Sequence, residues 1–193
     1  NGTLVPPNEF IPVAEDIGLI VKMTQHAVKQ GLIDLRQWYD LGHEPYLSIN
    51  LSVKDLEQST LADDFALLIE ASGLPPSLIR FEITESALMI DIDKAIDTMH
   101  KLTQLGVILA LDDFGTGYSS LAYLKKFPIT SLKIDKSFVL NLSDDKDDQA
   151  IVNSVISLGH FLGFEVLAEG VEQLEDYRLL QKIGCDQVQG YYF

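Results

Sequence analysis

The sequence predicts an α/β protein built around a parallel sheet. Along its 193 residues, short apolar runs rich in β-branched residues alternate with longer segments of helical periodicity. Six such strand and helix units recur at intervals of roughly 20–35 residues, a pattern typical of βα units that feed a parallel sheet. An open doubly wound sheet and a (β/α)₈ barrel both fit this pattern. A barrel typically needs about 250 residues, so this chain would supply most of one, with strands missing.

The six predicted strands are short and are separated by turn and breaker residues. Gly-Leu-Pro-Pro at 73–76 and Phe-Pro at 127–128 mark two connections, because proline neither continues a helix nor donates a hydrogen bond within a sheet. No stretch inside the chain has the composition of a linker, so we expect a single domain over residues 1–193. The predicted strands are residues 46–50, 78–82, 107–112, 131–134, 165–168 and 186–189.

Five helices are predicted from apolar residues that repeat with helical spacing. The clearest covers residues 147–162, and a run of acids precedes it, where carboxylates complement the positive end of the helix dipole. Its apolar stripe consists of Ile151, Val155, Leu158 and Leu162. A second helix covers residues 19–39, and Gly31 is expected to kink or divide it. Its apolar side consists of Val21, Val28, Leu32, Leu35 and Tyr39. The other helices are expected at residues 61–71, 91–105 and 174–183.

The charge balance limits the classes of ligand. The chain has 29 acidic and 14 basic side chains, which gives a formal net charge of −15. A broad nucleic-acid-binding surface needs Lys and Arg to neutralise phosphates, so a nucleic-acid polymer is excluded as a partner. No apolar run approaches the roughly 18–20 residues of a membrane span, so we expect no membrane contact by this domain.

The single cysteine and the two ends of the chain bear on its context. Cys185 has no partner for an internal disulfide, which favours a reducing compartment such as the cytoplasm. The chain begins at Asn1 without a methionine and stops at Phe193 directly after a predicted strand. We therefore expect a module of a longer protein, which could itself be anchored to the inner membrane.

A polar residue stands at or just after the end of every predicted strand. The carboxyl ends of parallel strands gather on one face, where ligands and catalytic groups are found. A single acid at such a place is most often a helix cap or a solvated loop residue, but capping does not explain the same pattern at strand after strand. In chain order these residues are Asn50, Glu82, Asp112 with Asp113, Lys133, Glu169 and Gln189.

Carboxylates that converge in a concave site repel one another, and a divalent cation is the usual remedy. Oxygen ligands from Asp, Glu and Asn favour Mg²⁺, Mn²⁺ or Ca²⁺ over zinc. The adjacent Asp112 and Asp113 suit a pair of ions, a known device for phosphoester hydrolysis. Lys133 would then hold or deprotonate the attacking water, if it points inward. The alternative is that Lys133 only neutralises buried carboxylates.

Several other residues have mainly structural interpretations. Gly115 and Gly117 predict a shaped functional loop at residues 113–120, because glycine allows unusual backbone angles and close approach. Trp38 and the aromatic residues 191–193 are expected in core or edge packing, although an aromatic beside Gln189 could stack on a base. Surface or packing positions are expected for His26, His43, His100 and His160.

Six motifs with these polar residues occur in order along the chain. They are Leu-Ser-Ile-Asn50-Leu-Ser, Glu82-Ile-Thr-Glu85, Asp112-Asp113-Phe-Gly-Thr-Gly-Tyr-Ser-Ser, Leu-Lys133-Ile-Asp135, Ala-Glu169-Gly-Val-Glu172 and Gln189-Gly-Tyr. In content and spacing they resemble the EAL domain of bacterial cyclic di-GMP phosphodiesterases, over nearly the whole chain. The resemblance implies a (β/α)₈ TIM-like barrel with one atypical antiparallel strand, incomplete in this chain. It also implies hydrolysis of cyclic di-GMP to linear pGpG at two Mg²⁺ or Mn²⁺ ions.

The resemblance further implies which residues bind the two ions. By the family pattern, Asn50, Glu82 and Asp112 would bind the first ion. Asp112 would also bridge to the second ion, and Asp113 would complete that second site.

It also implies the catalytic and substrate-binding residues. Lys133 and Glu169 would position the metal-bound water and, with Asp113, form the catalytic group. Glu172 and Gln189 would line the substrate and metal region.

The implied partners follow from the loop at residues 113–120. Glu85 would anchor this loop, which in the family links the metal site to dimerisation and to regulation by attached domains. The expected partners are therefore cyclic di-GMP, a second copy of the chain, and sensory or GGDEF-type domains.

One part of the family pattern does not occur in the chain. The Glu-Ala-Leu tripeptide, whose glutamate is a metal ligand, would precede Asn1, and the usual Ser-Lys-Pro stretch beyond Gln189-Gly-Tyr is missing too. Because the later positions are intact, we favour truncation over evolutionary loss, and we expect weak or no activity from these 193 residues alone. Two alternatives stay open. One is a degenerate EAL domain that acts as a cyclic di-GMP receptor or protein-interaction module, and the other is a different metal-dependent barrel enzyme.

Overall fold

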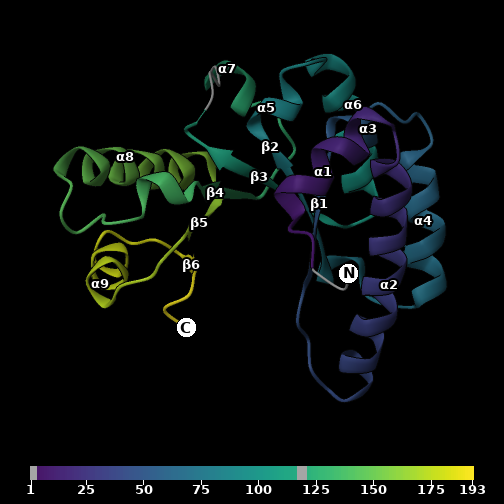
Figure 1. Ribbon diagram of the computed structural model, residues 1–193, viewed down its shortest axis with the longest axis horizontal. Helices are drawn as coiled ribbons and strands as arrows, with labels where there is room; N and C mark the ends of the chain where they lie inside the picture. Colours follow the sequence, from purple (N-terminus) through teal and green to yellow (C-terminus); the bar gives the residue numbers. More distant parts are fainter. Residues whose placement is uncertain (1–3, 117–120) are drawn as a thin grey trace. The chain divides into compact units, whose positions relative to one another are not determined.

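The computed structural model describes residues 4–116 and 121–193 and shows an α/β fold (Figure 1). Six strands form one sheet in the order β1-β2-β3-β4-β5-β6, and β3, β4, β5 and β6 pair in parallel. The predicted α/β class with a parallel sheet is confirmed, and every strand overlaps its predicted range. The antiparallel strand implied by the family resemblance stays a prediction. The strands are β1 (Leu47–Leu51), β2 (Ile79–Thr84), β3 (Ile108–Phe114), β4 (Ser131–Ile134), β5 (Glu165–Glu169) and β6 (Gln187–Gln189).

The chain divides into two compact units. The first comprises Asn1–Glu82 and Ala87–Val107, and the second comprises Ile83–Ser86 and Ile108–Phe193. The single domain expected over residues 1–193 stays a prediction. Within the described residues, none of the helices has both the length and the apolar character needed to cross a membrane.

The helices include all five predicted ones and several short ones that were not predicted. The first unit contains α1 (Pro7–Asp16), α2 (Ile20–Asp40), α3 (Val53–Leu56), α4 (Leu61–Ser72), η1 (Pro76–Leu78) and α6 (Ile92–Gln104). The second unit contains α7 (Leu121–Leu124), η2 (Lys136–Phe138), α8 (Lys146–Leu162) and α9 (Leu174–Lys182). The chain passes from the second unit back to the first within α5 (Glu85–Leu88).

Helix α2 forms the core of the first unit together with α4 and β1 (Figure 1). It is one continuous helix, so Gly31 does not divide it, and a kink there stays a prediction. A Cβ at Gly31 would lie 2.8 Å from both δ carbons of Leu47, so the glycine lets β1 approach the helix closely. Of the predicted apolar side, Val28, Leu32 and Leu35 are buried, whereas Val21 and Tyr39 are half-buried.

Helix α8 packs on strands β4 and β5 of the second unit through an unexpected face. Its buried residues are Val152, Ile156 and Gly159, so the predicted stripe is wrong by about one residue. Ile151, which begins the predicted stripe, is 39% exposed. The physical reason is Gly159, because a Cβ there would lie 2.4 Å from Cγ2 of Val166 on β5. The helix approaches the sheet most closely at a residue that a count of apolar side chains leaves out.

The exposed aromatic residues depart from the packing that we expected. Trp38 is 56% exposed, so a core position for it is wrong, and its ring meets His43 edge-on at 5.9 Å. Tyr191 is 94% exposed, whereas the rings of Tyr192 and Phe193 contact each other and Tyr177. The four histidines are exposed, as predicted.

Candidate metal centre

Three carboxylates of the second unit form an acidic cluster at the carboxyl ends of β3 and β5. They belong to Asp112, Asp113 and Glu169, and one oxygen from each lies within 4.8 Å of the others. Parallel pairing of β3 with β4 and of β4 with β5 brings these strand ends to one edge. The predicted convergence of acids at strand ends is therefore observed for this cluster.

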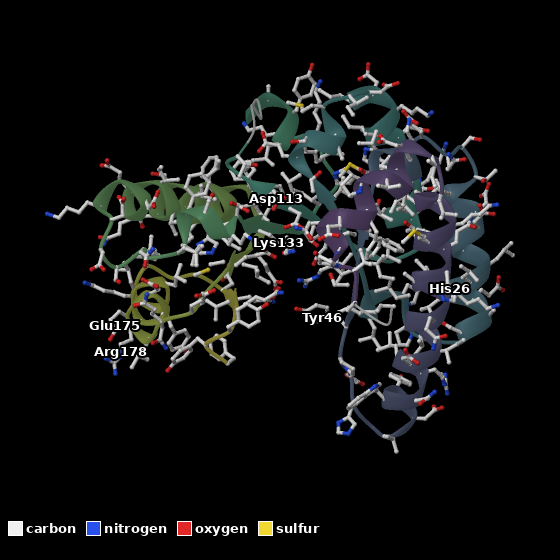
Figure 2. The ribbon with its side chains drawn as sticks, viewed as in Figure 1. His26, Tyr46, Asp113, Lys133, Glu175 and Arg178 are labelled. Atoms are coloured by element: carbon white, nitrogen blue, oxygen red, sulfur yellow. The ribbon has the colours of Figure 1, made fainter. Side chains whose placement is uncertain are left out.

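Lys133 lies on β4, the strand between the two that carry the acidic cluster (Figure 2). Its exposed fraction is 3%. Its Nζ is 3.0 Å from Oδ1 of Asp112 and 2.6 Å from Oε1 of Glu169. The side chain is therefore buried toward the acidic cluster, which is the condition that its predicted role required. These two contacts fit the alternative interpretation of Lys133, in which its ammonium neutralises buried carboxylates. Deprotonation of water by Lys133 stays a prediction.

The environment of Asp113 is unfavourable for a charged carboxylate. Its φ is +54°, a left-handed conformation that is uncommon outside glycine, and its amide N–H donates to Oδ1 of Asp112 at 3.0 Å. Burial raises the pKa of Asp113 from 3.8 to about 6. The carboxylates of Asp112, Asp135 and Glu169 and a hydrogen bond with Asp135 contribute to the same increase. The sequence predicts that carboxylates crowd together at the strand ends, and in the structure three of them act on Asp113.

Asp135 is a member of this site to which the sequence analysis gave no role. It follows β4 directly, so its position after a strand was the available signal. Burial alone would raise the pKa of Asp135, but hydrogen bonds with Ser137 and Asp113 outweigh it and lower this pKa. Its Oδ1 accepts the amide N–H of Ser137 at 2.9 Å. Asp135 therefore adds a further negative charge beside Asp113, in addition to those of Asp112 and Glu169.

The acidic cluster fits a divalent cation. All its donors are oxygens, and carboxylates this close repel one another unless a proton or a cation lies between them. Burial is the main cause of the raised pKa of Asp113, and the neighbouring carboxylates raise it further. The resemblance implies that Glu169 positions the metal-bound water. In the structure, Glu169 lies as close to the two aspartates as a ligand of a shared ion would. The cluster could thus hold a hard cation such as Mg²⁺ or Mn²⁺.

A cavity of about 450 Å³ lies beside the cluster in the second unit. Glu172 and Gln189, which were expected to line the substrate region, line it together with Glu169, and substrate binding there stays a prediction. Lys136 lines the same cavity and was not predicted. It fits there because Gly170 has no side chain: a Cβ at Gly170 would lie 2.6 Å from that of Lys136.

Asn50 and Glu82, the remaining predicted metal ligands, belong to the first unit. Glu82 is 8% exposed, and one of its carboxylate oxygens, Oε1, accepts a hydrogen bond from the hydroxyl of Ser48. Side chains alternate along a strand, so Asn50 lies on the same face of β1 as Ser48. That Asn50 and Glu82 share an ion with Asp112 stays a prediction.

Glu85 is positioned to hold the start of the predicted loop. It is 2% exposed, and its Oε2 accepts the amide N–H of Gly115 at 3.3 Å. Both residues belong to the second unit. Residues 117–120 of the predicted loop lie outside the described residues, and the role of Glu85 as its anchor stays a prediction.

Comparison with known proteins identifies the family that the sequence motifs resemble. The family model described as the EAL domain matches residues 1–193. The chain is 39% identical over 193 residues to the signaling protein YkoW of Bacillus subtilis, covering the whole chain and 24% of the relative. It is 38% identical over 189 residues to the bifunctional diguanylate cyclase/cyclic di-GMP phosphodiesterase MucR of Pseudomonas aeruginosa, covering 97% of the chain and 28% of MucR. The chain thus spans about a quarter of the length of these relatives.

Solved structures agree with these relatives. The PaMucR phosphodiesterase in complex with c-di-GMP has a TM-score of 0.95 and 37% identity, and the match covers all of this chain and 78% of that one. The FimX EAL domain has a TM-score of 0.93 and 27% identity, over 99% of this chain and 77% of that one. These likenesses confirm the predicted barrel-like α/β fold. With a family model that matches from the first residue to the last, the chain belongs to the EAL domain family.

Proposed function

We propose that this chain is the phosphodiesterase domain of a signalling protein and that it hydrolyses cyclic di-GMP to linear pGpG with two divalent ions. The observation that carries this proposal is the acidic cluster with Lys133 at its centre. A domain that only bound nucleotide would have less use for three crowded carboxylates and a buried lysine at one point. Relatives named as cyclic di-GMP phosphodiesterases support the choice of substrate.

Asp112, Asp113 and Glu169 would hold the ions in the second unit, with Asn50 and Glu82 as predicted further ligands. Bound Mg²⁺ or Mn²⁺ supplies activation of a water and stabilisation of charge on the phosphate oxygens. The chain's own residues prepare this site.

Lys133 contributes by holding two carboxylates in place. Its contacts with Asp112 and Glu169 fix both side chains before an ion arrives. A bound cation would favour the ionised form of Asp113, because its charge would outweigh that of the neighbouring carboxylates. Glu172 and Gln189 then face a dinucleotide in the adjoining cavity, with carboxylate and amide groups suited to the polar edge of guanine.

The same proposal covers the context of the domain. The curated relatives are about four times longer than this chain, and MucR is named for a second activity, that of a diguanylate cyclase. We propose a module attached to sensory or GGDEF-type domains, acting as a homodimer in the cytoplasm. Size measurement of the natural full-length protein tests the dimer.

The experiment is a turnover assay on the natural full-length protein. Cyclic di-GMP is followed by chromatography in Mg²⁺, in Mn²⁺ and in a chelator, for the wild type and for Asp112→Asn. The matched control is Asp97→Asn, which removes an exposed carboxylate paired with Lys101 on α6. We expect metal-dependent pGpG from the wild type and Asp97→Asn, and at least a hundredfold loss in Asp112→Asn.

Two results would count against the proposal. Absence of pGpG under either ion, with cyclic di-GMP still bound, would favour the receptor alternative. Full turnover by folded Asp112→Asn would show that the acidic cluster is structural.

A further inference from the structure

Strands β1 and β2 carry two polar pairs on one shared face. The guanidinium of Arg80 lies over the ring of Tyr46 at 4.3 Å, and the hydroxyl of Ser48 bonds to Glu82. Tyr46 immediately precedes β1, two residues before Ser48, and Arg80 lies two residues before Glu82. The alternation of side chains therefore puts all four on one face of the strand pair. Glu82 is thus fixed from the neighbouring strand.

We propose that Ser48 is a positioning residue for the metal ion that Glu82 binds, an inference that rests on the proposed function. Ser48 holds Oε1 of Glu82 and so sets the orientation in which the carboxylate meets the ion. A hydroxyl that donates to a carboxylate needs the carboxylate as acceptor, which is the form that binds a cation. Hydrogen bonds of this kind orient metal ligands, and their loss typically costs about 10–100-fold in metal affinity or activity.

A purely structural role for Ser48 makes a different prediction. Glu82 is almost fully buried (its side chain and backbone together are 8% exposed), and a buried carboxylate oxygen benefits from any donor. In that case loss of the hydroxyl lowers the stability of the metal-free protein and leaves metal affinity where it was. Ser48 itself is exposed, so water can replace a hydroxyl in this structural role. A water molecule would not keep the carboxylate of Glu82 in one orientation. A measurement of metal affinity therefore distinguishes the positioning role of Ser48 from the structural role.

The test measures Mn²⁺ binding directly, by electron paramagnetic resonance of free Mn²⁺, on the natural full-length protein. The variants are Ser48→Ala, Ser48→Thr, which keeps the hydroxyl on a β-branched side chain, and Glu82→Gln. The matched control is Ser154→Ala, whose hydroxyl bonds to the carbonyl of Ala150 at an exposed position on α8. Thermal melting in chelator checks that each variant folds.

We expect Ser48→Ala to weaken Mn²⁺ binding about tenfold or more and to shift the Mn²⁺ dependence of turnover by the same factor, with kcat at saturating Mn²⁺ little changed. Ser48→Thr should restore binding to within about threefold, and Ser154→Ala should match the wild type. Wild-type Mn²⁺ affinity in folded Ser48→Ala overturns the inference.

The same measurements distinguish failure of the inference about Ser48 from failure of the proposed function. If Glu82→Gln loses Mn²⁺ while Ser48→Ala does not, only the role of Ser48 is wrong. If the wild type binds no Mn²⁺, the inference fails, and turnover in Mg²⁺ decides the proposed function separately. If Ser48→Ala weakens Mn²⁺ binding but the wild type produces no pGpG, the inference stands and the enzymatic proposal fails.

Discussion

The carboxyl of Asp113 makes the stability of the metal-free protein depend on pH in an unusual direction. Burial and three neighbouring carboxylates raise the pKa of Asp113 from 3.8 to about 6 in the folded protein. Between these values the folded protein keeps a proton that the unfolded chain has lost, so folding is favoured by acid. This contribution is fully present below pH 3.8 and is lost as the pH rises through 6. Most carboxylates in proteins act in the opposite sense.

The change that isolates this effect is Asp113→Asn, which keeps the shape and removes the charge. A pKa difference of about two units corresponds to about 3 kcal/mol at neutral pH. Because Asp113 is only half-buried, solvent and salt screen the repulsion, and we expect roughly 1 kcal/mol. For a chain of this size that is a rise in melting temperature of about 2–4 °C. Asparagine also tolerates a positive φ, which adds a gain that does not depend on pH.

The assay is thermal melting in chelator between pH 4 and pH 8, for the wild type and Asp113→Asn, with Asp97→Asn as control. The difference between Asp113→Asn and the wild type should grow as the pH rises through 6 and stay constant for Asp97→Asn. Adding Mn²⁺ at pH 7.5 should reverse the order, because only the wild type gains binding energy, about 2.7 kcal/mol at a hundred times the Kd. A difference that is the same at every pH would refute the electrostatic reasoning.

Three further predictions concern α8 and Lys133. Gly159→Ala should lower the free energy of unfolding by about 1–3 kcal/mol in denaturant melts, because the new methyl would overlap Val166, and Val166→Ala should recover part of that loss. Lys133→Met should abolish metal-dependent turnover and lower the free energy of unfolding by about 3–5 kcal/mol, because it leaves Asp112 and Glu169 without their buried ammonium. Unchanged stability in the same denaturant melts would contradict this prediction. Asp145→Ala should cost about 1 kcal/mol, because it removes the carboxylate that caps α8, whereas Asp145→Asn should retain most of the cap.

The strands and the long helices could be predicted because their signals are local. A run of β-branched residues or a helical repeat of apolar residues is written in neighbouring positions, and the structure confirms each such element. The errors come from residues whose role depends on a distant partner. Gly159 and Gly31 carry no apolar side chain, yet they mark the closest approaches of α8 to Val166 and of α2 to Leu47. Helix α1 was missed because Pro12 lies inside it and reads as a breaker.

The candidate site shows the same division between local and distant information. The order of strands predicted that Asp112, Asp113 and Glu169 converge, because parallel strands end at one edge. It did not predict the left-handed backbone of Asp113, which lies where the register between β3 and β4 shifts, between Leu111 and Phe114. Nor did it predict that Ser48 bonds to Glu82, since the pairing of the two side chains depends on the register between strands.

The local charge explains how a chain of net charge −15 could bind an anionic dinucleotide. Asp112, Asp113, Asp135 and Glu169 bring four carboxylates together, against the ammonium groups of Lys133 and of Lys136, which acts on Asp135, so two negative charges are in excess when all are ionised. Burial is the main cause of the raised pKa of Asp113, and the neighbouring carboxylates add to it. One divalent ion would neutralise the excess, and a second would make the site positive. The same acids that repel a phosphodiester from the metal-free site therefore concentrate the cations that attract it, which makes substrate binding conditional on metal.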